Sequence, residues 1–277
     1  MDFFDFIQVG GLRVRYADTG YGTAASGGSS KKKAILLIHG LGGSIESWTN
    51  NFDALAKQGL RVIALDLPGF GQSDKPKMDY TVKFYSDFVA RFVRELKAAP
   101  LAVAGSSLGA HVAAELAINH PGIVSRLVLI SPPGALPRSF AGTPALRRYV
   151  RVLQARDVEQ VKKALAAVDN RPVADDYAKA VYEKLAMPGA KEAFLSALAG
   201  TARAPRLTPR LHLIKAPTLL IWGQQDIMIP VKFAEPFIKK IKSCRAVLLE
   251  NCGHRPHVDK AAVFNHLVAG FVHEECQ

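Results

Sequence analysis

Cysteine is scarce in this sequence of 277 residues, and the three present, Cys244, Cys252 and Cys276, all fall late in the chain. An odd, clustered set argues against a disulfide framework and favours a reducing compartment. No apolar run approaches the ~18 residues that cross a bilayer, and the opening segment MDFFDFIQVGG lacks the basic start and long apolar stretch of a secretory signal. We therefore expect a soluble, cytoplasmic protein without a membrane span.

Basic clusters interleaved with aromatic residues, a usual mark of a nucleic-acid surface, are also missing. The chain is nevertheless basic, with 36 Lys and Arg against 24 Asp and Glu and a formal net charge of +12. Most basic residues are dispersed, and the one compact run, Lys31 to Lys33, follows a segment rich in Gly and Ser. This pattern is typical of a solvated surface loop, so we expect no nucleic-acid partner.

Short apolar runs alternate with helical patterns along most of the chain. The runs are continuous, which is typical of strands covered on both faces. Such alternation requires crossover connections and predicts an α/β fold with a mostly parallel, eight-stranded sheet flanked by helices. The first two strands, at 3–9 and 12–20, are expected to pair antiparallel. Further strands are expected at 34–40, 61–69, 101–107, 126–134, 216–223 and 245–251, and helices at 48–57, 82–97, 108–119, 231–241 and 261–273.

The segment 135–212 interrupts this alternation, because no convincing strand occurs in it. It predicts four amphipathic helices, which begin at Thr143-Pro144, at the capping box Asp157-x-x-Gln160, at Asp175-Asp176 and at Gly189. We expect these helices to form a lid over the edge of the sheet, with the core domain divided into 1–134 and 213–277. The lid has 14 Lys and Arg against 7 Asp and Glu, which leaves open whether it selects anionic substrates.

The stretch VAGSSLGAHVAAELA (103–117) joins a predicted strand to a predicted helix and contains the pattern G-x-S-x-G. A sharp strand-to-helix turn strains the central residue and requires glycine on both sides, because a Cβ there would collide with neighbouring backbone. Only Ser107 has glycine at both offsets, since Ala104 precedes Ser106 by two residues. The pattern therefore predicts Ser107 as a nucleophile at the carboxyl end of the sheet.

A serine hydroxyl needs a base to become a nucleophile at neutral pH. His254 follows the last predicted strand, and Asp226 lies in the loop after the preceding one, which gives the chain order Ser107, Asp226, His254 that this topology requires. The glycine-rich turn in LLIHGLGGS (36–44) predicts an oxyanion hole in which the backbone N–H groups of Leu41 and Leu108 are the donors.

Other polar residues near these motifs receive structural interpretations. His39 is expected to fix the oxyanion turn. Asp66 is expected to anchor the glycine-rich loop after its strand, and the alternative for Asp66 is that it acts as a second acid. His257 and Cys252 lie close to His254 in sequence, but no carboxylate cluster joins them. We therefore expect neither a metal nor a cofactor.

Five motifs occur in a fixed order: HGLGGS, DLPGFGQSDKP, GSSLGA, GQQDIMIP and GHRPHVD. In this order they resemble the α/β-hydrolase superfamily, in particular its lidded branch of serine esterases, lipases, enol-lactonases and carbon–carbon hydrolases. The resemblance implies the α/β-hydrolase fold and disfavours members with an aspartate nucleophile, because the central elbow residue is Ser107. Carbon–carbon hydrolases commonly have asparagine before the serine and tryptophan after the histidine; this sequence has Ser106 and Arg255 there.

The interpretation placed first is a carboxylesterase for small-to-medium acyl chains, in which an acyl-enzyme forms on Ser107 and water hydrolyses it. The alternative is a carbon–carbon (meta-cleavage product) or enol-lactone hydrolase. A lesser alternative is a non-catalytic member of the fold that binds a ligand in the same pocket. A small-molecule ester is the expected partner, and pairing of lid helices across a homodimer stays open.

Overall fold

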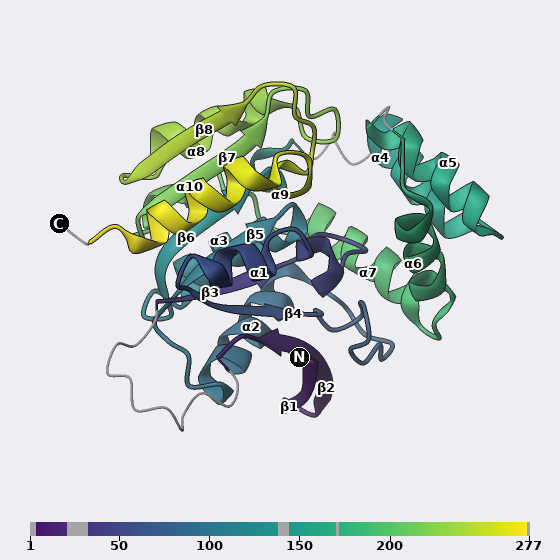
Figure 1. Ribbon diagram of the computed structural model, residues 1–277, viewed down its shortest axis with the longest axis horizontal. Coiled ribbons are helices and arrows are strands. Elements are labelled where there is room, and N and C mark those ends of the chain that lie inside the picture. The colour runs from purple at the N-terminus through teal and green to yellow at the C-terminus, as the bar shows by residue number, and fades with distance from the viewer. Residues whose placement is uncertain (1–3, 21–32, 138–143, 170–171, 276–277) are drawn as a thin grey trace.

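The computed structural model describes residues 4–20, 33–137, 144–169 and 172–275. Eight strands in these ranges form one sheet in the order β1-β2-β4-β3-β5-β6-β7-β8 (Figure 1). Pairing is antiparallel between β1 and β2 and between β2 and β4, and parallel from β4 to β8. The strands are β1 (Phe4–Val9), β2 (Leu12–Asp18), β3 (Ala34–Ile38), β4 (Arg61–Leu65), β5 (Leu101–Ser106), β6 (Val124–Ile130), β7 (Thr218–Gly223) and β8 (Cys244–Leu249).

The mostly parallel eight-stranded sheet predicted from the apolar runs is confirmed. Every residue of β5 and of β7 is buried, as expected for strands that are covered on both faces. Residues 31, 32, 143 and 276, named above for the basic run, a helix start and a cysteine, lie outside the described ranges. No described helix is both long and apolar enough to cross a lipid bilayer.

Helices cover both faces of the sheet and create two hydrophobic cores. One core packs α1 (Phe52–Lys57) and α10 (Ala261–His273) against the sheet. The other contains α2 (Val82–Glu95), α3 (Leu108–Asn119) and α8 (Glu235–Lys240). The side chains of β5 and β7 alternate between these cores, which explains why these strands are apolar almost without interruption.

Two helices begin later in the chain than the sequence indicated. The helix expected from Trp48 begins only at Phe52, because Ile45–Trp48 forms a separate 3₁₀ turn. The helix expected over 231–241 divides into a 3₁₀ turn, Val231–Ala234, and α8, which carries a proline in its first turn. A proline there lacks an N–H that the helix would leave unpaired in any case, so it suits a helix start. The short helix α9 (Pro256–Asp259) was not predicted.

Four α-helices lie in the described residues between β6 and β7: α4 (Pro144–Val150), α5 (Val158–Asp169), α6 (Asp175–Ala186) and α7 (Ala190–Arg203). We call α4–α7 the helical insert. Figure 1 shows α4, α5 and α6 grouped at one end of the molecule, with α7 nearer the sheet. The insert has a small hydrophobic core of its own around Val152, Val161 and Ala178. The capping signal before α5 is present, since Gln160 N–H donates to Asp157 Oδ1 at 2.8 Å.

Candidate active site

Ser107 occupies a sharp turn between β5 and α3. Its backbone has φ 54° and ψ −117°, a strained conformation for a residue with a side chain. A Cβ on Gly105 would lie 2.2 Å from the Gly109 carbonyl oxygen, and a Cβ on Gly109 would lie 2.2 Å from that of Ile38. Both glycines of the pattern are therefore required by close backbone contact, as the sequence argument anticipated.

Asp226 and His254 form the one direct contact between predicted site side chains. His254 Nδ1 lies 2.8 Å from Asp226 Oδ2, and Asp226 is 4% exposed. The other oxygen, Asp226 Oδ1, accepts the backbone N–H groups of Met228 (2.9 Å) and Ile229 (2.8 Å), which fixes the carboxylate. A carboxylate at Nδ1 keeps the ring proton there and leaves the Nε2 lone pair to act as a base.

The two predicted oxyanion donors lie at different elements. Leu108 is the first residue of α3, so its N–H has no acceptor within the helix. Leu41 lies in the turn after β3, and Gly43 N–H closes this turn by donating to the Gly40 carbonyl at 3.0 Å. Neither the Leu41 nor the Leu108 amide donates to another main-chain carbonyl of the described residues. Both N–H groups are thus suited to bind an anion.

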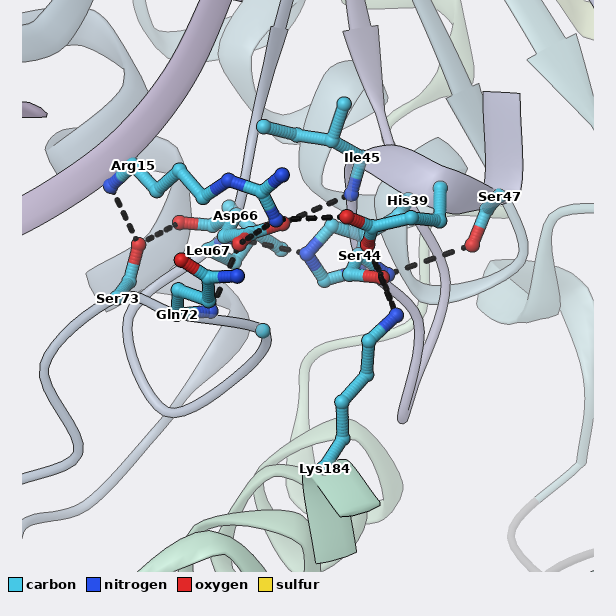
Figure 2. Close-up of polar contacts among 12 residues, drawn as sticks. Arg15, His39, Ser44, Ile45, Ser47, Asp66, Leu67, Gln72, Ser73 and Lys184 are labelled. Atoms are coloured by element: carbon cyan, nitrogen blue, oxygen red, sulfur yellow. Dashed lines mark hydrogen bonds and ion pairs between the residues drawn. The ribbon is translucent and has the colours of Figure 1, made fainter. Parts of the chain in front are cut away.

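His39 and Asp66 fix the backbone around this turn (Figure 2). His39 Nε2 accepts the Leu67 N–H at 3.0 Å, so Nδ1 carries the proton and donates to the Gly40 carbonyl at 2.8 Å. Burial lowers the pKa of His39, which keeps the ring neutral in this role. Asp66 accepts the N–H groups of Ile45 and Gln72, both at 2.8 Å, and so joins the loops after β3 and β4. Both residues have the structural roles expected of them.

Ser107, His254, Leu41 and Leu108 all line one cavity of about 890 Å³. Its wall extends from the sheet edge into the helical insert. The residues from the insert and its flanks include Leu146, Tyr149, Leu165, Tyr177, Leu195, Leu198 and Pro205. A cavity of this size suits a small organic molecule. The structure therefore brings the nucleophile, the base and both donor residues of the sequence prediction to a shared space, with Asp226 behind His254.

Charged residues on the cavity wall were not predicted as site residues. Arg206 follows α7, and its Nη2 lies 3.5 Å from the Ala135 carbonyl. Arg255 follows His254, and its guanidinium carbon lies 5.4 Å from the centre of the Tyr177 ring. Asp259 accepts the Gly253 N–H at 3.2 Å and so secures the loop before His254. The position of Arg255 beside His254 was a signal in the sequence, whereas Arg206 meets Ala135 from a distant segment, which the sequence pattern does not specify.

The histidines near the site do not form a metal centre. His257 is buried against Trp48, with ring centres 4.5 Å apart, and burial together with the charges of Arg255 and His254 lowers its pKa to about 3. Within the described ranges, no group of three or more His, Cys, Asp or Glu side chains is arranged to hold a metal ion. His257 is therefore a neutral residue of the cavity wall.

The family described as alpha/beta hydrolase fold matches residues 33–261 of this chain. The chain is 33% identical over 273 residues to the dihydrolipoyllysine-residue acetyltransferase component of the acetoin cleaving system of Cupriavidus necator, covering 96% of this chain and 68% of that one. It is 30% identical over 277 residues to a 2-hydroxy-6-oxononadienedioate/2-hydroxy-6-oxononatrienedioate hydrolase of Burkholderia vietnamiensis, covering 94% and 91%.

A solved structure with the same fold is that of a bacterial membrane phospholipase A. It superimposes with a TM-score of 0.79 at 31% sequence identity, covering 98% of this chain and 87% of that one. The similar proteins thus have names that refer to different substrates.

Proposed function

This chain belongs to the alpha/beta hydrolase fold family, and from that membership we propose that it is a serine hydrolase with Ser107 as nucleophile, His254 as general base and Asp226 as the residue that orients His254. The observation that carries the proposal is the 2.8 Å contact between His254 Nδ1 and Asp226 Oδ2, with Ser107 and His254 on the same cavity. The strained backbone of Ser107 supports it, because such strain is typical of functional residues.

In the proposed first step, His254 Nε2 takes the proton of Ser107 as its oxygen attacks a substrate carbonyl carbon. The carbonyl oxygen becomes an oxyanion, which the amides of Leu41 and Leu108 stabilise. The bond to the leaving group then breaks, and the leaving group takes both bonding electrons and the proton from His254. An acyl-enzyme on Ser107 remains.

In the second step, His254 removes a proton from water as the water oxygen attacks the acyl carbon. The oxyanion that forms is again stabilised by the amides of Leu41 and Leu108. Collapse returns the proton to Ser107 and releases a carboxylic acid. This sequence works for oxygen and carbon leaving groups alike, provided that a carbon leaving group can delocalise its electron pair before it is protonated. The choice of bond is therefore made by the substrate and the cavity wall rather than by the three catalytic residues.

We propose a carbon–carbon bond beside a ketone, in a conjugated substrate that carries a carboxylate, as the preferred target. The sequence alone had placed esters first, but the relative of Burkholderia vietnamiensis, which aligns over nearly its whole length, is named for a 6-oxo dienedioate. Arg206 and Arg255 on the cavity wall support an anionic substrate, because guanidinium groups pair well with carboxylates. Ser106 and Arg255 still depart from the pattern expected of carbon–carbon hydrolases.

A carboxylic ester is the second candidate. It is favoured by the similarity to the phospholipase A structure and by the largely apolar residues that the insert contributes to the cavity. An enol-lactone is cleaved by the same chemistry, because it is an ester in which the leaving oxygen belongs to an enol. We further propose that residues 135–212 act as a cap that selects among these substrates, because α4, α6 and α7 all contribute to the cavity wall.

The test compares turnover of a 2-hydroxy-6-oxo dienoate with that of short-chain nitrophenyl esters, in the wild-type protein and in Ser107→Ala. We expect kcat/KM to be higher for the dienoate and to fall by at least about 10³-fold for both substrates in the variant. Circular dichroism checks that the variant is folded. Faster ester turnover in the wild type would assign the ester function instead, and full activity of Ser107→Ala would refute the nucleophile.

A further inference from the structure

Two residues of the helical insert, Tyr149 and Lys184, make polar contacts with residues 40–46, which we call the oxyanion loop. Tyr149, in α4, donates from its hydroxyl to the Leu41 carbonyl at 2.6 Å. Lys184, in α6, donates to Glu46 Oε2 at 2.8 Å and to Ser44 Oγ at 2.5 Å. These two insert residues come from different helices and contact opposite ends of the oxyanion loop. The insert therefore holds the loop at both of its ends.

The contact of Tyr149 bears directly on the predicted donor amide. The Leu41 N–H shares a rigid peptide plane with the Gly40 carbonyl, which is held by His39 from the core. The next peptide plane begins with the Leu41 carbonyl, which is held by Tyr149 from the insert. With the planes on both sides of its Cα fixed, Leu41 has little freedom to rotate, and the direction of its N–H is set jointly by core and insert.

Packing beside this hydrogen bond leaves no spare room. The Tyr149 ring packs against Phe194 of α7, with ring centres 5.6 Å apart. A Cβ added to Gly42 would lie 2.8 Å from an atom of Phe194 and 2.8 Å from the Tyr149 hydroxyl oxygen. The oxyanion loop is therefore in van der Waals contact with the insert, and any movement of α4 or α7 toward or away from the core changes the space available to it.

The contact of Lys184 belongs to a charge network that joins insert and core (Figure 2). Ser44 Oγ donates to Glu46 Oε2 at 2.6 Å, and Arg15 of β2 donates to Glu46 Oε1 at 2.7 Å. Burial alone would raise the pKa of Glu46, but the bonds from Lys184, Ser44 and Arg15 outweigh it and hold the pKa well below its usual range. Glu46 thus stays ionised, paired with one cation from the core and one from the insert.

We propose that Tyr149 and Lys184 are positioning residues through which the helical insert orients the Leu41 amide, so that stabilisation of the oxyanion depends on a docked insert. The inference rests on the proposed function, because it concerns the same oxyanion hole. It gives the insert a second role beside forming the cavity wall. Neither residue is required to touch the substrate's reacting atoms for this role.

The first test removes the Tyr149 hydroxyl in Tyr149→Phe and uses Tyr182→Phe as the matched control, since the Tyr182 hydroxyl donates to the Arg156 carbonyl at 2.9 Å within the insert. Loss of one oxyanion donor costs about 10²–10³ in rate, so its misplacement is expected to cost about 10-fold. We expect kcat and the rate of Ser107 labelling by a fluorophosphonate to fall about 10-fold in Tyr149→Phe, with KM nearly unchanged. Tyr182→Phe should match the wild type.

A second measurement separates positioning from general loss of structure. A trifluoromethyl ketone forms an oxyanion with Ser107, whereas a carboxylate product does not, so only the ketone's affinity is expected to fall about 10-fold in Tyr149→Phe. The melting temperature is recorded for each variant. Equal behaviour of Tyr149→Phe and Tyr182→Phe in labelling and in ketone affinity would overturn the proposal, as would a rise in KM at unchanged kcat.

The Lys184 arm is independent of the tyrosine. Lys184→Met removes the bridge to Glu46, and Lys162→Met is its control, because Lys162 pairs with Asp175 inside the insert. We expect about a 10-fold lower labelling rate in Lys184→Met, partial recovery in Lys184→Arg, and none of this loss in Lys162→Met. No difference between the two methionine variants would overturn the role of Lys184. Failure of the proposed function is distinguishable, because wild-type Ser107 would then not be labelled at all.

Discussion

At the scale of single residues, the orientation of His254 depends on which atoms of Asp226 face it. Oδ1 is occupied by two backbone N–H groups, which leaves Oδ2 as the acceptor for His254 Nδ1–H. An amide in place of the carboxylate keeps its oxygen on the two backbone donors and turns its NH₂ group toward the imidazole. The ring must then accept at Nδ1 and carry its proton at Nε2, so it cannot take the proton of Ser107.

Asp226→Asn is therefore expected to lower kcat/KM by about 10³–10⁴-fold near neutral pH while the fold is retained. Steady-state kinetics with the preferred substrate measure the loss. Asp87→Asn serves as the control, because Asp87 is half-exposed and pairs with Lys83 and His120 away from the cavity. An Asp226→Asn variant as active as this control would contradict the assigned role.

The choice of Ser107 over Ser106 was predictable because the constraint is local: two glycines at fixed offsets are needed for a turn that the next residues complete. Tyr149 and Lys184 carried no such signal. Tyr149 lies 108 positions along the chain from Leu41, and Lys184 lies 138 positions from Glu46. Contacts of that separation depend on how the insert packs on the core, which neither periodicity nor spacing in one sequence specifies.

At the scale of elements, the four helices of the insert were located because each has a recognisable start. Asp157 accepts the Gln160 N–H, and the Gln160 side chain accepts the Arg156 N–H at 3.1 Å. Two backbone N–H groups at the start of α5 therefore have side-chain acceptors. By contrast, the 3₁₀ turn at Ile45–Trp48 contains the first residue of an expected helix, and Asp66 binds the Ile45 N–H of this turn from another loop. A tertiary hydrogen bond of that kind leaves no trace in the local pattern.

Asp157→Ala is expected to destabilise the start of α5 by about 1 kcal/mol, the usual value of a helix cap. Amide hydrogen exchange should speed up in the first turns of α5 and remain unchanged in β5 and β7, which lie in the core. Glu159→Ala is the control, because Glu159 lies in the same turn and forms an exposed ion pair with Lys163. Unchanged exchange in α5 of the Asp157 variant would show that the cap contributes nothing there.

At the scale of the whole molecule, the sheet assembles the site. The segments that follow β3, β5, β7 and β8 carry Leu41, Ser107, Asp226 and His254, and parallel strands end at one common edge. This convergence was predictable, because the alternation of strands and helices fixes the parallel arrangement. The packing of the insert against the same edge was only outlined by the sequence, and the boundary at 135–212 stays a prediction.

Buried histidines make the stability of the folded state depend on pH. Burial lowers the pKa of His111 to about 4 and that of His257 to about 3, and it lowers the pKa of His39 as well. In the unfolded chain a histidine has a pKa of about 6.5, so between pH 6.5 and 4 the unfolded state binds protons that the folded state does not. The stability that these neutral rings contribute is complete above pH 6.5 and is lost as the pH falls.

The free energy of unfolding is accordingly expected to decrease by about 1.4 kcal/mol per pH unit for each of His111 and His257 over this window. Urea denaturation at several pH values measures the slope. His257→Asn should reduce the slope by about 1.4 kcal/mol per pH unit, the contribution of one histidine, because asparagine does not titrate in this pH range. The wild type and His257→Asn are compared over the same pH range. Equal slopes in the two proteins would mean that protonation of His257 does not oppose folding, and that its ring gains access to water in the native state.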